Sequence, residues 1–567
     1  MKKRWLPRPA PMMELKQVPD LHGLPSSLAL LLARRGYEGE SLERYLDPDM
    51  ACLSDWRRIG GMEEVAGRIA SAVRGSEMIL VHGDYDADGI TATAVVYLAL
   101  KSLGARVDYF IPDRFDDGYG LGESSIQACL DAGAELMVTV DCGISDSEHV
   151  RVLAGMGVDT VITDHHQPGE EVPPAVAVVD PAMDDGAHYA DLAGVGVAWM
   201  AMKGVFDLLG GDPEYLHTLL QLVAVGTVAD VVELTGDNRI LVSEGMAVLR
   251  REPFPGIEAV SRSASIDIRR ATSTDLAYYI GPRLNACGRI GHAHEAVRLL
   301  LASEEDDVNG LAAKVDANNR LRRKLDGELE EQVLRRTGDP EGRRCIVMAD
   351  GDWHRGVIGI VASRLVARFG VPALLIALED GMGFGSARSV PGIPIHSILS
   401  DIQFRLGIME SLGGHPMAAG FRVIPDNVPW LREELCKVMT EDRWDRYLGS
   451  VVYIDGRLEE EDYSAGMARA LDLMEPFGQG NRMPVWIARG AYPVTWKPVG
   501  RDGKHLSCSF RLGSGTVRAI GFNMADRQSM FSGRVDLAFT LSLDTWRNDG
   551  SVQLVLKDIR KHRSIEP

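Results

Sequence analysis

Residues 78–89 read Met-Ile-Leu-Val-His-Gly-Asp-Tyr-Asp-Ala-Asp-Gly, an apolar run followed by three aspartates at alternate positions. The apolar run is typical of a buried strand. The carboxylates of Asp84, Asp86 and Asp88 at its end would repel one another, and a bound cation is the usual way in which a protein tolerates such a cluster. We therefore interpret the stretch as a strand that ends in a metal-binding turn.

Two other interpretations of the three aspartates are weaker. An EF-hand calcium loop also begins with this alternation, but it needs a glutamate at its twelfth position, where this chain has Val95, and it lies between two helices. An acidic turn that caps a helix starting near Ile90 would explain one aspartate but not three.

The sequence around this turn alternates between strand-like and helix-like segments. The expected strands are 77–83, 107–111, 136–140, 160–163 and 175–179, and the expected helices are 91–103, 124–132 and about 147–154. Such alternation predicts a parallel sheet with crossover helices. In these sheets the ligand site lies outside the carboxyl ends of the strands, so polar residues that follow the strands should converge.

Polar residues do follow several of the expected strands. Asp141 comes after one of them, and His165 and His166 come after another. We interpret Asp230, in the aliphatic stretch 222–234, as a further acidic exit. Each of these alone could be a helix cap or a hydrogen-bonded core residue. Together with the triple-aspartate turn they favour a metal centre.

Carboxylates with one or two imidazoles form a hard ligand set that suits Mn²⁺ or Mg²⁺ better than structural zinc, and histidine shifts the choice toward Mn²⁺. So many anionic ligands can hold two cations, which promote phosphoryl displacement by water. We expect Asp88 to bridge the pair, and Asp141, His165 and His166 to complete the catalytic group. No serine or cysteine nucleophile is evident, because Cys142 has no obvious base.

The second half of the chain predicts a long connecting helix over about 295–337, a second α/β segment and a small β-barrel. The α/β segment has expected strands at 345–349 and 372–377 and an expected helix at 357–369. From about residue 450 the pattern turns to short β-like runs at 451–454, 494–496, 506–510, 517–520 and 552–556. The expected fold class is therefore α/β, with a parallel-sheet domain, a second α/β domain and a C-terminal β-barrel.

Groups suited to phosphate occur beyond residue 280. Residues 383–389, Gly-Phe-Gly-Ser-Ala-Arg-Ser, offer flexible backbone donors and the guanidinium of Arg388, whose fork matches two phosphate oxygens. Residues 413–420 form another glycine-rich loop. The arginines and the amide of 281–289 are similarly suggestive, namely Arg283, Asn285 and Arg289. Plain glycine turns and solvated arginines are the alternatives.

The totals give no sign of a membrane span. The 567 residues suggest three or four domains, and no stretch reaches about 18 uninterrupted apolar residues. The N-terminus lacks the apolar segment of a secretory signal, so we expect a cytoplasmic location. Seven scattered cysteines without a Cys-x-x-Cys pair indicate neither a disulfide framework nor a zinc site.

The net charge of −20 argues against a nucleic-acid partner only superficially. From residue 480 to the end there are 14 Lys and Arg against 7 Asp and Glu, a local charge of +7. A basic C-terminal region on an acidic body is compatible with localised binding of a polyanion.

Four motifs, in this order, resemble those of the DHH phosphoesterase superfamily: residues 84–89, 140–143, 163–166 and 226–230. Further segments at 281–289, 353–359, 413–415 and 475–481 are similar to those of the RecJ single-stranded-DNA exonucleases, and the likeness covers about residues 50–565. The chain departs from the usual pattern at Glu233, Cys287 and Arg482, none of which is a proposed ligand.

Resemblance to the RecJ family implies the following domains: an N-terminal segment over 1–50, a DHH catalytic domain over 51–294, a connecting helix over 295–340, a DHH-associated domain over 341–430 and an oligonucleotide-binding (OB) barrel over 445–567. The activity implied is Mn²⁺- or Mg²⁺-dependent degradation of single-stranded DNA from the 5′ end to mononucleotides, in DNA repair and recombination. The partners implied are single-stranded DNA, a single-stranded-DNA-binding protein and a helicase.

The same resemblance implies roles for individual residues. The metal ligands would be Asp86, Asp88, Asp141, His165 and Asp230, with Asp84 as a sixth ligand and with His82 and His166 close by. The 5′ phosphate would lie in a pocket that contains Arg114, Ser386 and Arg388. Further contacts to DNA would come from His415, Arg283, Asn285 and Arg289.

Two other functions stay open at this point. A DHH enzyme that hydrolyses very short oligoribonucleotides or cyclic dinucleotides would lack the C-terminal barrel. A non-catalytic replication scaffold would have lost ligands, whereas every motif acid is present here. Four aromatic residues could stack on bases, although such residues are more often in the core: Trp496, Trp546, Tyr119 and Phe477.

Overall fold

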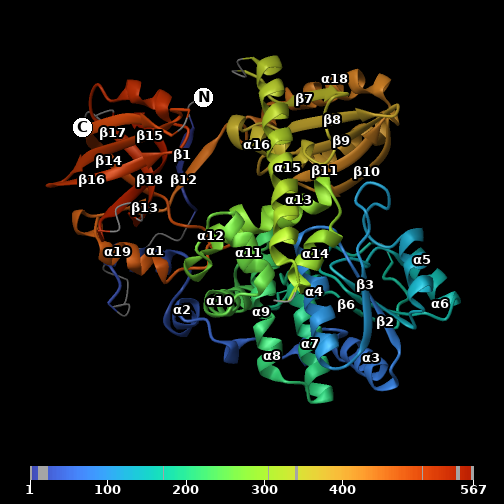
Figure 1. Cartoon of the computed structure of the whole chain (residues 1–567). Helices are drawn as coiled ribbons and strands as arrows, with labels where there is room; N and C mark the ends of the chain where they lie inside the picture. The colour runs from blue at the N-terminus through green and yellow to red at the C-terminus, as the bar shows by residue number, and fades with distance from the viewer. Residues whose placement is uncertain are drawn as a thin grey trace. The chain divides into compact units, whose positions relative to one another are not determined.

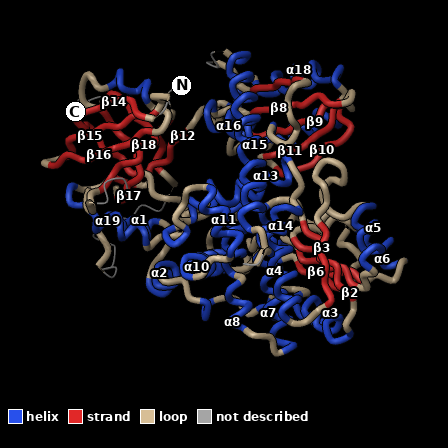
Figure 2. The backbone as a smooth tube through the Cα atoms, viewed as in Figure 1, coloured by secondary structure: helices blue, strands red, loops and turns tan. Residues whose placement is uncertain are grey.

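The computed structural model describes residues 3–9, 23–169, 171–184, 186–303, 306–338, 342–500, 502–544 and 549–562. The chain forms two compact units. Figures 1 and 2 show the helices and strands of both units. We call the first the aspartate unit; it comprises Glu38–Leu321 and Leu473–Met483. We call the second the barrel unit; it comprises Met1–Tyr37, Arg322–Asp472 and Pro484–Pro567.

The aspartate unit is built on a five-stranded sheet in which every pair of neighbouring strands is parallel. Its strands are β2 (Met78–Gly83), β3 (Arg106–Phe110), β4 (Leu136–Val140), β5 (Asp159–Thr163) and β6 (Ala177–Val179), in the order β3-β2-β4-β5-β6. The parallel sheet predicted from the sequence is confirmed. The strand order reverses between β2 and β4, and such a switch point opens a crevice at the carboxyl ends of the two strands.

Helices cover both faces of this sheet. One face packs on α3 (Met62–Gly75), α4 (Ala87–Ser102) and α7 (Gly194–Leu209), and the other on α5 (Glu123–Ala132) and α6 (Ser147–Gly155). Along β2, Ile79 and Val81 belong to the first core and Leu80 belongs to the second. Successive residues of a strand point to opposite faces, so a strand buried on both faces is apolar throughout. This explains the apolar run before the aspartates.

The remaining helices of the aspartate unit pack around this sheet layer. They are α2 (Gly39–Leu46), α8 (Pro213–Thr218), α9 (Leu220–Asp230), α10 (Gly236–Arg251), α11 (Pro255–Ser263), α12 (Ser273–Asp275), α13 (Gly281–Ile290) and α14 (His294–Leu301). The interpretation of 222–234 as a strand with an acidic exit was wrong, because Asp230 is the last residue of helix α9. Helix α9 is buried all round against α4, α7 and α10. A helix buried on every side has no polar face, so its sequence cannot be distinguished from that of a buried strand.

The predicted long helix is interrupted. Helix α14 ends at Leu301, and α15 begins at Val308 and continues to Thr337. Between them, the Ser303 backbone N–H donates to Asp306 Oδ2 at 2.8 Å. Serine and aspartate side chains that bond to nearby backbone offer an alternative to helical hydrogen bonds, which accounts for the break.

The first half of the barrel unit contains a mixed five-stranded sheet in the order β10-β11-β9-β8-β7. Its strands are β7 (Ile346–Asp350), β8 (Ala373–Glu379), β9 (Met382–Arg388), β10 (Met409–His415) and β11 (Ala418–Val423), and its helices are α16 (Ile358–Phe369), α17 (Ile395–Leu406) and α18 (Val428–Met439). The second α/β domain is therefore confirmed.

Both glycine-rich stretches that the sequence indicated as flexible loops were assigned wrongly. Residues 383–388 lie within β9, and residues 413–420 form the end of β10, a tight turn and the start of β11. A Cβ added at Gly385 would lie 2.1 Å from the Phe421 ring. Glycine is therefore needed there for close packing of β9 on β11 rather than for flexibility.

The second half of the barrel unit is a closed barrel. The ring is formed by β14 (Trp486–Val499), β15 (His505–Leu512), β16 (Gly515–Gly521), β18 (Val552–Lys561) and β17 (Val535–Leu543), and pairing of β14 with β17 closes it. The short strand β13 (Gly456–Arg457) pairs with β14 outside the ring. The predicted barrel is confirmed, although the sequence analysis missed β17 and included residues 451–454, which lie outside the barrel. Helix α19 (Ala465–Asp472) and α1 (Ser26–Arg34) lie beside it, and β1 (Arg4–Pro7) pairs with β12 (Val451–Ile454).

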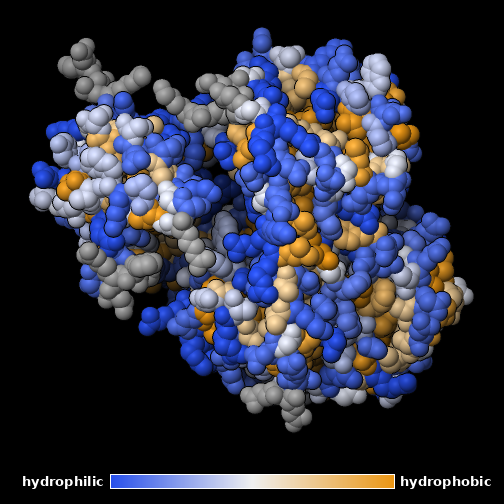
Figure 3. All heavy atoms as spheres, turned by 45° about the horizontal axis from the view of Figure 1, so that its top comes forward, coloured by the Kyte–Doolittle hydropathy of each residue, from blue (hydrophilic) through white to orange (hydrophobic). Residues whose placement is uncertain are grey.

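The surface of the described residues is mostly hydrophilic on the face drawn in Figure 3, with separate hydrophobic patches. Among the helices of the described residues, none combines the length and the apolar composition that a membrane crossing requires.

Two glycines on the packed helix pair α3 and α7 should respond in opposite ways to alanine. Gly67→Ala on α3 meets nothing within 4 Å and should stabilise the fold by about 0.5–1 kcal/mol through helix propensity. At Gly204 on α7 the added Cβ would lie 2.8 Å from Ala66 Cβ and 3.0 Å from the Trp56 ring, so Gly204→Ala should destabilise by about 1–3 kcal/mol. Thermal unfolding of both variants checks this, and equal shifts would contradict the packing of α3 on α7.

Candidate metal centre

The turn after β2 places its three aspartates differently. Asp86 caps α4: its Oδ1 accepts from the backbone N–H of Asp88 at 2.9 Å and of Gly89 at 3.2 Å. A Cβ at Gly89 would lie 2.5 Å from Asp84 O, so the turn can close only over glycine. The capping alternative thus holds for Asp86, and it leaves the carboxylates of Asp84 and Asp88 to be explained.

Asp88 is 1% exposed and is anchored by the start of another helix. Its Oδ2 accepts from Gly194 N at 2.7 Å and its Oδ1 from Val195 N at 2.9 Å, both in the first turn of α7. Unpaired N–H groups and the positive end of the helix dipole stabilise a carboxylate there. The sequence analysis missed this anchor, although the Gly-Val-Gly-Val run at 194–197 was a signal for a close backbone approach.

Asp141 follows β4 with φ +61°, a left-handed conformation that is uncommon for a residue with a side chain. Strain of this kind persists where the surroundings hold it, and it gathers at functional sites. A Cβ at Gly194 would lie 2.4 Å from Asp141 Oδ1. The first turn of α7 therefore confines two of the predicted ligands, Asp88 and Asp141, at once.

The two histidines after β5 are oriented by Asp164. Asp164 Oδ1 lies 2.8 Å from His166 Nδ1 and accepts from His165 N at 2.8 Å, while Oδ2 accepts from Ile144 N at 3.0 Å. The ring of His165 then faces the aspartates: its Nε2 lies 3.1 Å from Asp141 Oδ1 and 3.8 Å from Asp88 Oδ2. Asp164 thus orients the residues that are candidate ligands without being one itself, a role that sequence reasoning did not assign.

Asp230 reaches the same place from the end of α9, with its Oδ2 3.8 Å from His165 Nε2. The candidate ligands form three overlapping groups in which one ligand atom from each residue lies within 4.8 Å of the others. The groups are Asp84, Asp86 and Asp141; Asp88, His165 and Asp230; and Asp141, His165 and His166. All the residues that the sequence nominated as ligands are brought together.

Several ligand atoms are buried without a hydrogen-bond partner among the described residues: Asp84 Oδ1, Asp141 Oδ1 and His165 Nε2. Leaving buried polar atoms unpaired costs free energy. Carboxylate oxygens with one or two imidazole nitrogens are the donors that Mn²⁺ and Mg²⁺ accept. The residues present therefore fit divalent cations of this kind.

Burial and mutual repulsion perturb the protonation of the cluster. Burial, and then the neighbouring carboxylates, raise the pKa values of Asp84, Asp88 and Asp141 well above 3.8. Burial and Asp86 raise the pKa of Asp230 to about 7. Burial and His166 lower the pKa of His165 to about 4, so its imidazole is neutral, as a metal ligand must be. Without a cation, joint ionisation of these carboxylates is disfavoured.

Two neighbours of the cluster are unsuited to catalysis. Cys142 is fully buried, and burial and then Asp164 raise the pKa of its thiol well above 9.0. A thiol that stays protonated is a poor nucleophile. His82 points to the face of the sheet that α5 and α6 cover, and its Nε2 lies 2.9 Å from Ser125 Oγ on α5. Burial lowers the pKa of His82 to about 4.

Three of the four predicted DNA-contacting residues of the aspartate unit lie near the candidate metal centre. Asn285 on α13 accepts from Ala87 N at 3.0 Å and so supports the aspartate turn. The guanidinium of Arg114 lies 4.9 Å from the centre of the Tyr85 ring and lowers the pKa of Asp84 against the effect of burial. Arg289 is also close enough to act on the pKa of Tyr85. These three border the metal centre.

Arg283 is different, because the residue is only 7% exposed. Its Nε pairs with Asp316 Oδ1 at 3.0 Å, and its Nη1 donates to Tyr279 O at 2.8 Å. This placement favours a structural ion pair that joins α13 to α15 over a contact with DNA phosphate.

The three remaining candidates belong to the barrel unit. Arg388 Nη1 donates to Ser386 Oγ at 2.9 Å, and both lie on β9. A Cβ at Gly359, in the first turn of α16, would lie 2.9 Å from Ser386 Oγ and 3.0 Å from Arg388 Nη2, so the start of that helix packs directly on the pair. An arginine beside a helix N-terminus suits a phosphate. His415 is the exposed last residue of β10.

Of the aromatic candidates for base stacking, two are exposed and one is buried. Tyr119 is 48% exposed and its hydroxyl lies 3.0 Å from His166 Nδ1, at the metal centre. Trp496 is 43% exposed on the barrel, with its ring edge against Phe531. Phe477 is 8% exposed and therefore part of the core, and Trp546 lies outside the described residues.

Comparison with protein families gives three matches along the chain. Residues 78–227 match the DHH family N-terminal domain, residues 342–441 match the DHHA1 domain and residues 454–558 match the RecJ OB domain. The first contains the parallel sheet and every candidate ligand except Asp230, the second contains the mixed sheet with Ser386 and Arg388, and the third contains most of the barrel.

Curated relatives match over nearly the whole chain. The single-stranded-DNA-specific exonuclease RecJ of Dickeya dadantii is 36% identical over 96% of this chain and 97% of its own length, and that of Escherichia coli is 33% identical over 96% and 98%. Among solved structures, RecJ of Thermus thermophilus in complex with Mn²⁺ superposes with a TM-score of 0.84 at 31% identity, covering 99% of this chain and 80% of that one. From its three domains and these full-length relatives, the chain belongs to the RecJ family.

Proposed function

We propose that this chain is a metal-dependent exonuclease that degrades single-stranded DNA from the 5′ end to mononucleotides, in DNA repair and recombination. The observation that carries the proposal is the convergence of six carboxylate and imidazole ligands from four separate parts of the chain on one crevice. The relatives that share its domains are named as single-stranded-DNA-specific exonucleases, and related structures are titled as complexes with Mn²⁺ or Mg²⁺.

The metal centre is proposed to hold two Mn²⁺ or Mg²⁺ ions through Asp84, Asp86, Asp88, Asp141, His165 and Asp230. When bound, such a pair would lower the pKa of the attacking water and stabilise negative charge on the attacking and leaving oxygens at the phosphorus atom. The chain's own contribution is placement. The first turn of α7 fixes Asp88, which faces both His165 and the crevice and is our candidate for the bridging ligand. Asp164 holds the ring of His166 beside Asp141.

The 5′ phosphate is proposed to bind Ser386 and Arg388, together with Arg114, and His415 is proposed to contact the same end of the DNA. Support comes from the fork of Arg388 beside the first turn of α16, where unpaired backbone N–H groups favour an anion.

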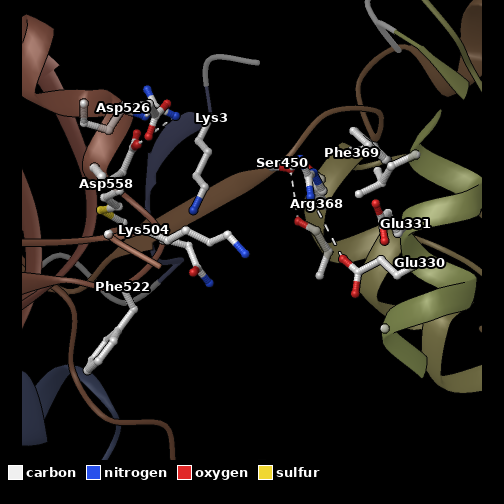
Figure 4. Close-up of a pocket in the computed structure, with 18 residues that line it drawn as sticks. Lys3, Glu330, Glu331, Arg368, Phe369, Ser450, Lys504, Phe522, Asp526 and Asp558 are labelled. Carbon is white, nitrogen blue, oxygen red and sulfur yellow. Dashed lines mark hydrogen bonds and ion pairs between the residues drawn. The ribbon is translucent and has the colours of Figure 1, made fainter. Parts of the chain in front are cut away.

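The barrel is proposed to bind the single-stranded DNA. In the barrel unit a cavity of about 1270 Å³ separates barrel residues from α15 and α16 (Figure 4). Lys504 and the exposed ring of Phe522 lie on the barrel side together with Asp526 and Asp558, whereas Glu330, Glu331 and Arg368 lie on the opposite side. Both sides carry mixed charges, so support for a DNA strand on the barrel wall comes from the exposed ring of Phe522, because an aromatic face suits the bases of single-stranded DNA.

The two rival functions receive less support. The RecJ OB domain is matched, and an enzyme for very short oligonucleotides needs no such barrel. All six candidate ligands are close together, which a scaffold without catalysis does not require. We further propose that the enzyme works in the cytoplasm with a single-stranded-DNA-binding protein and a helicase that supply its substrate.

The substrate and polarity are tested with end-labelled DNA and Mn²⁺. We expect digestion of single strands from the 5′ end and little digestion of blunt duplex. Asp141→Asn should reduce the rate by about 10²–10³-fold, because loss of a ligand removes several kcal/mol of transition-state stabilisation. Equal digestion of duplex, attack from the 3′ end only, or full activity of Asp141→Asn would overturn the proposal.

Metal binding should stabilise the protein more at higher pH. The raised pKa values of Asp230 and its neighbours mean that the metal-free folded chain binds more protons than the unfolded chain between pH 3.8 and about 7, so its stability falls as the pH rises through this window. Divalent cations relieve that repulsion. The rise in Tm on adding Mn²⁺ should therefore be larger at about pH 7.5 than at about pH 5.5. Asp141→Asn is the control, and the rise in its Tm on adding Mn²⁺ should be smaller at both pH values. An equal rise in Tm at the two pH values in the native protein would count against this account.

Arg388→Ala should remove the preference for a 5′-phosphorylated end. A hydrogen bond to a charged group is worth about 1.5–3 kcal/mol, so kcat/KM on 5′-phosphorylated DNA should fall about 10–100-fold, while 5′-hydroxyl DNA is affected less. Arg405→Ala is the matched control, since Arg405 lies on α17 in the same domain and pairs with Glu434 at 3.0 Å. The assignment fails if both ends lose activity equally.

A further inference from the structure

Residues Leu473–Met483 belong to the aspartate unit, although the chain before and after them belongs to the barrel unit. Helix α19 ends at Asp472, and strand β14 begins at Trp486. We call residues 473–483 the insert. The insert contains the segment Glu475–Asn481, which is one of the segments similar to the RecJ family. None of its residues has a part in the proposed function.

A buried arginine ties the insert to helix α10. Arg239 is 4% exposed, and its guanidinium donates to Met474 O at 3.2 Å and Glu475 O at 2.9 Å. It also donates to Tyr45 O at 2.7 Å and stacks on the Tyr45 ring at 4.1 Å. Breaking contacts of a buried charge is costly, so this end of the insert is firmly held.

The insert is also organised internally by Asn481, which is 2% exposed. Its Nδ2 donates to Met474 O at 2.7 Å and to Pro476 O at 2.9 Å, and its Oδ1 accepts from Tyr45 OH at 2.7 Å. An amide satisfied on both sides fixes the loop in one conformation.

The insert packs against the residues that follow Asp230. Leu234 N donates to Gln479 O at 2.9 Å, and Glu233 forms a parallel β-bridge with Gln479. A Cβ at Gly480 would lie 3.1 Å from both Glu233 Cβ and Thr235 Cγ2. The backbone of the insert therefore lies directly on residues 233–235.

Between that contact and the metal centre is a strained turn. Asp230 ends α9, and Val231 follows with φ +70° and 64% exposure. A β-branched residue in the left-handed region is a genuine outlier that the surroundings must hold in place. The described contacts that hold the far side of the turn include the insert and Asn238, whose Nδ2 donates to Glu233 O at 3.1 Å.

We propose that the insert is a positioning device for Asp230: by gripping residues 233–235 it maintains the strained turn at Val231 and keeps the Asp230 carboxylate beside His165. The inference rests on the proposed function of Asp230 as a metal ligand. Gly480, Gln479 and Asn481 would act through Asp230 and would touch neither metal nor DNA.

Gly480→Ala in the full-length protein tests the proposal, with binding of Mn²⁺ measured from the EPR signal of the free ion, without DNA. Mutation of a residue that holds a metal ligand in place typically weakens metal binding by about 10–100-fold. We therefore expect the Mn²⁺ affinity of Gly480→Ala to be at least about tenfold weaker. Cleavage should require correspondingly more Mn²⁺ and recover at saturation, which general damage to the fold would not allow. Gly478→Ala, whose Cβ would lie 2.6 Å from Leu234 Cδ1, should act in the same direction.

Gly210→Ala is the matched control. Gly210 has φ +72°, almost the same as φ +71° at Gly480, and lies in the same unit, but an added Cβ meets nothing within 4 Å. Both variants therefore carry similar backbone strain, and only the insert variant presses on residues 233–235. Mn²⁺ affinity should be unchanged in Gly210→Ala.

Asp230→Asn separates failure of this inference from failure of the proposed function. Native Mn²⁺ affinity in Asp230→Asn would refute the ligand role itself. Weak binding by Asp230→Asn with native binding by folded Gly480→Ala and Gly478→Ala would refute only the positioning role. If neither glycine variant folds, hydrogen exchange on the native protein decides: Mn²⁺ should slow exchange at the Leu234 amide, because coupling is reciprocal, and unchanged exchange would overturn the inference.

Discussion

Repulsion among carboxylates that are buried at the carboxyl end of the parallel sheet is the constraint on which the rest of this structure depends. Asp84, Asp88 and Asp141 are each at most 5% exposed, and burial disfavours their charged forms. These carboxylates nevertheless lie close together, at the point where the strand order reverses. The surrounding backbone must therefore stabilise their negative charges.

That arrangement uses backbone groups more than side chains. The first turn of α7 supplies two N–H donors to Asp88, and the start of α4 supplies two to Asp86. Helix starts offer such donors at fixed positions, so they hold carboxylates without adding cations that would compete with a metal. The glycines at 89 and 194 follow from the same requirement, because a side chain at either would collide with Asp84 or Asp141.

The sequence predicted the parts of this site that depend on local pattern. The triple-aspartate turn, Asp141 and His165 follow apolar strands, so their convergence could be expected from sheet geometry alone. Asp230 was found by its isolation among aliphatic residues but placed on the wrong element, since a helix buried on all sides has no polar stripe. The anchoring of Asp88 by Gly194 and Val195 is a contact over more than a hundred residues, and no periodicity encodes such a contact. The same limit applies to Arg283, whose ion pair with Asp316 only tertiary structure reveals.

The insert connects the sequence of the barrel unit to the candidate metal centre. The chain enters the aspartate unit at residue 473 and leaves it at residue 483, and in between it contacts residues 233–235, close in sequence to the candidate ligand Asp230. An ordinary linker would make few contacts with either unit. Here Arg239 and Asn481 hold the first residues of the insert, Met474 and Glu475, inside the aspartate unit. If the insert positions Asp230 as we propose, the coupling is reciprocal, and order in the insert and order at Asp230 would rise and fall together.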